Sequence, residues 1–151
     1  MARGAGFPDL PPLWTVVFVV ASVMAGKFLP LITLPIPFNK AIGIVFALAG
    51  VVVIFWSALW FRRKKTAINP YGKPSTLIVE GPYRINRNPI YTGMFLIVVG
   101  SACWVGALSS IIIAFVFPWL ITHRFIKREE AALSTAFGEE ADAYFKKSRR
   151  W

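Results

Sequence analysis

Long uncharged stretches alternate with short charged or proline-rich segments along this chain. Residues 10–26 carry no charge. Two prolines at the start of this stretch favour a helix beginning just after them, so we expect a first span over about residues 13–31, with Lys27 extending toward the membrane surface. Residues 41–61 form a second span, about 31 Å long, which matches a hydrocarbon core of about 30 Å. A cleaved signal peptide is the alternative for the first stretch, because it is short and ends in small residues.

The third uncharged stretch, residues 88–122, is too long for one span. Small residues at positions 106–110 favour a turn there. We therefore expect two closely packed helices at about 89–105 and 109–125, with a re-entrant hairpin as the alternative. The fold class predicted for residues 1–151 is a single all-α, polytopic membrane domain of about four transmembrane helices, followed by a C-terminal amphipathic helix over residues 126–151.

Composition agrees with membrane insertion. Hydrophobic residues make up 56% of the chain, charged residues only 16%, and the mean hydropathy is +0.59. A soluble domain of this size needs more polar surface, and a disordered chain is far less apolar. The net charge of +10 would suggest nucleic acid in a soluble protein. In an apolar chain it marks cytoplasmic loops, so we expect membrane lipids and no nucleic acid as partners.

Basic residues also predict the orientation. They gather in the loop 62–88 and in the tail 124–150, whereas the connection between the first two spans has few. By the positive-inside rule, the loop, the C-terminal helix and both termini are cytoplasmic. We expect a multi-pass protein of a prokaryotic inner membrane. Because the chain has one cysteine and one histidine, neither a disulfide nor a Cys/His metal cluster is expected.

The most distinctive polar sequence lies directly against the third span: residues 80–93 read EGPYRINRNPIYTG. Asn88 and Pro89 have the form of a helix start, in which the asparagine side chain caps free N–H groups and proline takes the first position. Capping does not account for Tyr91 or Gly93. A glycine one turn into a membrane helix indicates close approach, either by another helix or by a ligand.

A second candidate is the pair Glu129 and Glu130, just beyond the fourth span. On a helix Glu130 interrupts an apolar stripe, and a carboxylate in such a position needs a partner. That partner is either a nearby Arg or Lys, or a pair of ligand hydroxyls such as a ribose diol. Gly138 suits a helix end. Arg150, in the basic tail, either contacts lipid headgroups or holds an anionic substrate group.

Together these residues resemble the superfamily of isoprenylcysteine carboxyl methyltransferases and phospholipid N-methyltransferases, which are integral membrane enzymes. The resemblance covers roughly the last 90 residues, while the first two spans match only as generic hydrophobic helices. It runs through TAINP (66–70), PSTL (74–77), GPYR (81–84) and RNPIYTG (87–93), and resumes at Arg128-Glu129-Glu130, Leu133, Phe137-Gly138, Tyr144 and Arg150-Trp151.

The resemblance implies that S-adenosylmethionine binds between the start of the third span and the Glu-Glu helix, with S-adenosylhomocysteine as product. Asn88 stands where the family usually has histidine, and an asparagine cannot titrate near neutral pH. Arg87, Glu130 and Arg150 would be the catalytic residues, the two arginines orienting the cofactor carboxylate or the acceptor. The cofactor-binding residues implied are Tyr83, Asn88, Pro89, Tyr91, Gly93, Glu129 and Glu130.

Methyl transfer from a sulfonium is a displacement that needs positioning and exclusion of water rather than a metal. The acceptor is expected to be lipophilic and to enter from the bilayer: a prenylcysteine carboxylate, a phospholipid amine, a thiol or an isoprenoid. A nicotinamide-dependent reductase of the sterol-reductase type and a non-catalytic scaffold are the alternatives. An exporter is disfavoured because no acidic residue lies between Asp9 and Glu80.

Overall fold

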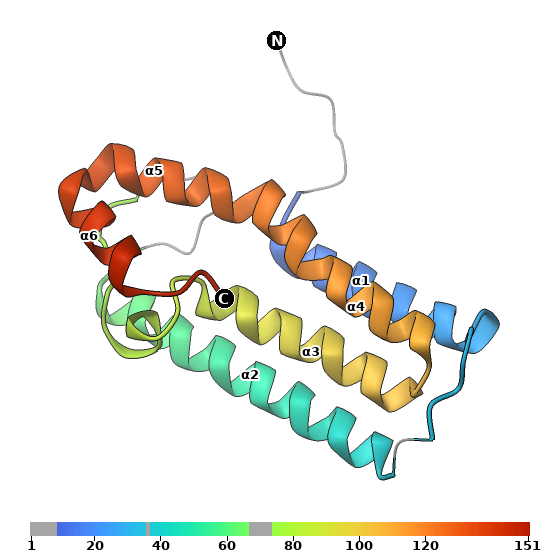
Figure 1. The fold of residues 1–151 in the computed structure, drawn as a ribbon. Coiled ribbons are helices and arrows are strands. Elements are labelled where there is room, and N and C mark those ends of the chain that lie inside the picture. Colours follow the sequence, from blue (N-terminus) through green and yellow to red (C-terminus); the bar gives the residue numbers. More distant parts are fainter. Residues whose placement is uncertain (1–8, 36, 67–73) are drawn as a thin grey trace.

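The computed structural model describes residues 9–35, 37–66 and 74–151, so residues 67–70 of the TAINP segment lie outside the described part. This part of the chain folds into helices (Figure 1). In chain order they are α1 (Pro11–Phe28), α2 (Asn39–Arg63), the 3₁₀ turn η1 (Gly81–Arg84), α3 (Pro89–Val105), α4 (Leu108–Ile121), the π-helical turn η2 (Thr122–Ile126), α5 (Lys127–Phe137) and α6 (Glu139–Lys147).

The all-α class predicted from the sequence is confirmed. Within the described residues, three helices are long and apolar enough to cross a membrane: α1, α2 and the continuous run Leu108–Phe137. α3 is a shorter apolar helix of 17 residues, and its bounds are those expected from the charge pattern. α1 begins earlier than expected, because its two prolines occupy the first turn, where no N–H donor is needed.

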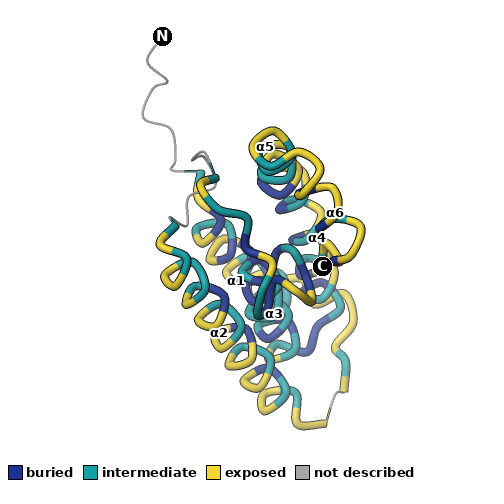
Figure 2. Tube along the Cα trace, turned by 90° about the vertical axis from the view of Figure 1, so that its left-hand side faces the viewer, coloured by how far each residue is buried: buried dark blue, intermediate teal, exposed yellow. Residues whose placement is uncertain are grey.

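α2 and α3 pack at very short range through glycines. A Cβ on Gly50 would lie 2.4 Å from the carbonyl oxygen of Gly93, and one on Gly43 would lie 2.7 Å from that of Gly100. The contacts are reciprocal, so the two backbones meet at two points seven residues apart on each helix. The opposite face of α2 is exposed (Figure 2) and carries large apolar side chains such as Phe55. That face is suited to lipid.

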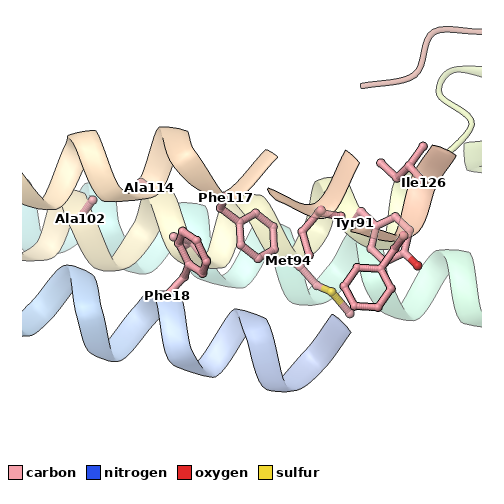
Figure 3. Close-up of a cluster of buried hydrophobic side chains, with 10 residues drawn as sticks. Phe18, Tyr91, Met94, Ala102, Ala114, Phe117 and Ile126 are labelled. Carbon is pink, nitrogen blue, oxygen red and sulfur yellow. The ribbon is translucent and has the colours of Figure 1, made fainter. Parts of the chain in front are cut away.

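α1 and α4 pack on α3 to complete the core. Phe18 of α1 meets Phe117 of α4 edge to face at 5.3 Å, and both belong to the buried cluster in Figure 3. Ser22 and Ser110 each donate a hydroxyl hydrogen bond to the backbone carbonyl of the other. At the α3–α4 turn, Gly106 adopts a left-handed conformation with φ of 68°. The two antiparallel helices predicted for residues 88–122 are therefore present.

Beyond α4 the helix continues through η2 into α5, so α5 projects beyond the bundle (Figure 1). The C-terminal helical segment expected over residues 126–151 is divided into two helices, and the helix end expected at Gly138 is present. Gly138, with φ of 50°, separates α5 from α6, and the last residues are extended. The tail returns to α3: the Arg87 amide donates to the Arg149 carbonyl at 2.7 Å. The Trp151 indole N–H donates to the Thr122 hydroxyl at 3.0 Å.

Candidate functional site

A cavity of about 480 Å³ lies where the start of α3 meets α5 and α6. The first turn of α1 and the end of α2 close its other sides. Most of its wall is apolar, and its polar groups come from η1, the start of α3 and the residues just before it, α5, α6 and the segment between α2 and η1. The lining residues are Leu10, Pro11, Pro12, Phe61, Thr66, Pro74, Ser75, Thr76, Leu77, Ile78, Tyr83, Arg87, Asn88, Pro89, Ile90, Tyr91, Met94, Glu129, Glu130, Ala132, Leu133, Tyr144 and Phe145.

The sequence prediction that the RNPIYTG segment and the Glu-Glu pair share one site is consistent with this geometry. Tyr91 donates its hydroxyl to the Glu129 carboxylate at 2.5 Å, although the two residues are 38 positions apart. Glu130 lines the same cavity. The segment 74–78, which includes the PSTL motif, forms a further wall.

Glu130 is neutralised by two guanidinium groups. Arg87 approaches its Oε1 atom to 3.1 Å, and Arg150 donates to Oε2 at 2.7 Å and to Oε1 at 3.0 Å. Its side chain is only 14% exposed. Of the two partners weighed for a carboxylate at this position, the arginine partner is the one present. A buried carboxylate paired in this way is costly to disturb, because removal of an arginine takes hydrogen bonds away from a charge that is shielded from water.

Arg87 ties three segments together. Besides Glu130, its Nη1 atom donates to the backbone carbonyls of Phe145 and Ser148, both at 2.7 Å. These carbonyls lie at the C-terminal end of α6, where a cation is favourable. Arg87 lines the cavity, but its guanidinium is engaged mainly by protein groups. Arg150 does not line the cavity, and 41% of its side chain is exposed.

The prediction that the Asn88 side chain caps the start of α3 is wrong. Its side chain donates to the Arg150 carbonyl at 2.9 Å and so anchors the C-terminal tail. The neighbouring Asn86 organises the turn instead. It accepts the Asn88 amide at 2.6 Å and donates to the Thr92 hydroxyl at 2.6 Å. Sequence reasoning missed Asn86, although an asparagine two residues before a helix entry is a known turn signal.

Gly93 also requires a correction, because it does not line the cavity. Its Cα faces α2, where an added Cβ would lie 2.6 Å from the Gly50 carbonyl oxygen. Of the two kinds of close approach proposed for Gly93, helix packing is the one present. Pro89 and Tyr91, by contrast, do line the cavity.

Two tyrosines complete the polar wall. Tyr144, which sequence reasoning did not assign to the site, donates its hydroxyl to the Tyr83 carbonyl at 2.6 Å. The Tyr83 side chain lines the cavity and is 7% exposed, yet its own hydroxyl has no hydrogen-bond partner among the described residues. Burial raises the pKa of Tyr83 above its ordinary value, and nearby Tyr144 and Glu129 add to this. A buried hydroxyl without a partner is costly, and a ligand can satisfy it.

Glu129 differs from Glu130 in having no cationic partner among residues 9–35, 37–66 and 74–151. It lies on α5, beyond the uncharged stretch that ends before Arg124. Burial raises the pKa of Glu129 to about 7, the Tyr91 hydrogen bond lowers it, and the charge of Glu130 raises it. Close to neutral pH this carboxyl group can therefore gain or lose a proton.

Comparison with known proteins agrees with this site. A family model, Phospholipid methyltransferase, matches residues 38–140, which include α2 and both candidate polar segments. The match thus begins earlier than the resemblance seen in the sequence. Neither the curated proteins nor the solved structures include a match to this chain. This is a multi-pass integral membrane protein, and the chain belongs to the phospholipid methyltransferase family, whose enzymes transfer a methyl group from S-adenosylmethionine to a phospholipid acceptor.

Proposed function

We propose that this protein binds S-adenosylmethionine in the cavity between α3 and α5 and methylates a phospholipid headgroup at the cytosolic surface of the membrane. One observation carries the proposal: Tyr83, residues 87–91 and residues 129–130, which are far apart in sequence, line one cavity. Its volume of about 480 Å³ lies within the roughly 300–1,000 Å³ of small-molecule sites.

The chemistry of the wall fits this donor. S-adenosylmethionine carries hydroxyls, an ammonium and a positively charged sulfonium, and it supplies an electrophilic methyl group when bound. The wall offers the unpartnered hydroxyl of Tyr83 and several aromatic rings that favour cations. We assign donor binding to the lining residues Tyr83, Asn88, Pro89, Tyr91 and Glu130.

Arg87 and Arg150 act through Glu130 in this proposal. Both guanidiniums hold its carboxylate and link α5 to the start of α3 and to the tail. They keep the polar wall in position, which a displacement reaction requires because small misplacements are costly in rate. They are positioning residues rather than catalytic ones.

The acceptor reaches this cavity from the lipid side. α1 and α2 each pack on α3 and have little contact with each other. These three helices all contribute apolar residues to the cavity wall, namely Pro11 of α1, Phe61 of α2, and Ile90 and Met94 of α3. Acyl chains suit that wall, and the headgroup would then lie at the polar end.

The topology proposed is four spans, α1 to α4, with the loop after α2, the helices α5 and α6, and both termini on the cytosolic side, all within one domain. α3 has 17 residues, or about 26 Å, and is shorter than α1 and α2. Because α3 packs on both α2 and α4, which span the membrane in this topology, α3 spans it as well.

Binding and transfer test the proposal directly. Purified protein in nanodiscs should bind S-adenosylhomocysteine with micromolar affinity and transfer radiolabelled methyl groups into phosphatidylethanolamine. Tyr83→Phe removes only a hydroxyl without a protein partner, so we expect affinity to fall about tenfold, the effect of roughly one hydrogen bond, without loss of thermal stability. Glu140→Gln, at an exposed position on α6, is the matched control. Binding of a nicotinamide dinucleotide but not of S-adenosylhomocysteine would contradict the proposal.

A further inference from the structure

The two adjacent carboxylates at the cavity are in opposite electrostatic states. Glu130 is held between Arg87 and Arg150. Glu129 receives one hydrogen bond, from Tyr91, and no cation pairs with it in the described part of the chain. A carboxylate buried beside a cavity without a counter-charge favours a ligand that brings one.

Few other titratable groups face Glu129. Tyr91 of α3 donates a hydrogen bond to it, and the buried Tyr83 of η1 lies within electrostatic range. Glu130 is the next residue along α5. Tyr144 of α6 faces Tyr83. Arg87, just before α3, is engaged by Glu130 and by the α6 carbonyls. The cavity-lining residues of α1 and α2, namely Pro11, Pro12 and Phe61, are apolar, as is Leu10 just before α1.

We propose that Glu129 binds the protonated amine headgroup of the phospholipid acceptor and serves as the general base of the transfer. The inference rests on the proposed function and identifies the acceptor chemistry as a primary or secondary amine. An ammonium headgroup would supply the cation that Glu129 lacks. The surrounding rings of Tyr83, Tyr91 and Tyr144 favour a cation as well.

The proton and electron balance is as follows. An N–H bond of the ammonium breaks, its proton passes to the Glu129 carboxylate, and the nitrogen keeps the electron pair. That pair forms the N–CH₃ bond while the bond between the methyl carbon and the donor sulfur breaks and leaves its electrons on sulfur. The product amine is again positively charged, and protonated Glu129 releases its proton to water. No oxidant, reductant or metal enters the balance.

Two features of Glu129 suit this role. Its pKa of about 7, raised by burial, matches a base that works near neutral pH. The Tyr91 hydrogen bond fixes its Oε1 atom and leaves Oε2 without a hydrogen bond from the described residues. Tyr91 thus orients the carboxylate through Oε1, and Oε2 is the oxygen that accepts the proton.

Glu129→Gln tests the proposal because the amide keeps the shape of the side chain and can still accept from Tyr91. In nanodiscs containing phosphatidylethanolamine, we expect affinity for S-adenosylhomocysteine to stay within tenfold of the native value. Methyl transfer at saturating donor should fall at least about 100-fold, as for loss of a general base. Native activity should rise with pH to a plateau above about 7, whereas the residual rate of the variant should keep rising toward the pKa of the lipid amine.

Tyr91→Phe provides a second readout. Removal of a hydrogen bond that lowers the pKa of Glu129 should move the rise in activity to higher pH. Glu140→Gln should keep the native rate and profile. Transfer by Glu129→Gln within threefold of the native rate at saturating donor, or an unchanged pH profile in both variants, would overturn the assignment. Absence of S-adenosylhomocysteine binding to the native protein would instead refute the proposed function.

Discussion

The buried carboxyl of Glu129 makes the stability of the ligand-free protein depend on pH. Its pKa is about 7 in the folded protein and about 4.5 when solvated, because burial disfavours the charged form. The stabilisation of the folded state by its protonated form is fully present below about pH 4.5 and is lost as pH rises through 7. At pH 8 the ionised form costs on the order of 3 kcal/mol, from about 1.4 kcal/mol per pKa unit.

Glu129→Gln should remove that cost while keeping the Tyr91 hydrogen bond. We expect the variant to be more stable than the native protein at pH 8, by up to about 3 kcal/mol, and to differ by less than about 1 kcal/mol at pH 5. Unfolding of both proteins in the same detergent, followed by circular dichroism from pH 5 to 9, measures the difference. Glu140→Gln, which changes an exposed carboxyl, should give no such trend.

Two results would refute this reasoning. One is a Glu129→Gln variant that is equally destabilised at pH 5 and pH 8, because the side chain would then matter through packing rather than charge. The other is a stability difference that decreases with rising pH, because the folded state would then favour the ionised form.

Three further predictions concern the scaffold. Gly50→Ala places a methyl 2.4 Å from the Gly93 carbonyl, so stability measured by unfolding in detergent should fall by about 1–3 kcal/mol, whereas Ala49→Val on the exposed face should have little effect. Arg87→Lys loses the two-pronged contact with Glu130 and the α6 carbonyls, so limited proteolysis should cleave the tail faster than in the native protein. Asn86→Ala removes two buried hydrogen bonds and should lower stability by about 1–3 kcal/mol, and an unchanged unfolding transition would contradict the turn described for this residue.

The sequence predicted α3 well because the signals that define it are local. A charge-free stretch, a proline at the start and a glycine at the end fix the bounds of this helix within a few residues. The meeting of Tyr91 with the acidic pair was also predictable, since antiparallel spans bring the cytosolic ends of α3 and α4 together. Helix periodicity further showed that Glu130 lies on an apolar face.

Other features depend on partners that sequence spacing does not reveal. Asn88 has the right residue type for a cap, but the returning tail offers its side chain a carbonyl instead. Gly93 could have faced a ligand or a helix, and only the register between α2 and α3 decides between them. The π-helical turn η2 has no sequence signal of its own, although it alters the direction in which the acidic pair faces.

A cavity-filling pair of variants tests the central claim most directly. Ala132 lines the cavity, whereas Ala136, one turn later on α5, is exposed. In calorimetric titrations of S-adenosylhomocysteine into nanodisc-embedded protein, we predict one binding site for the native protein and for Ala136→Trp. No binding is expected for a folded Ala132→Trp variant. Native affinity in Ala132→Trp would contradict the claim that the donor occupies this cavity.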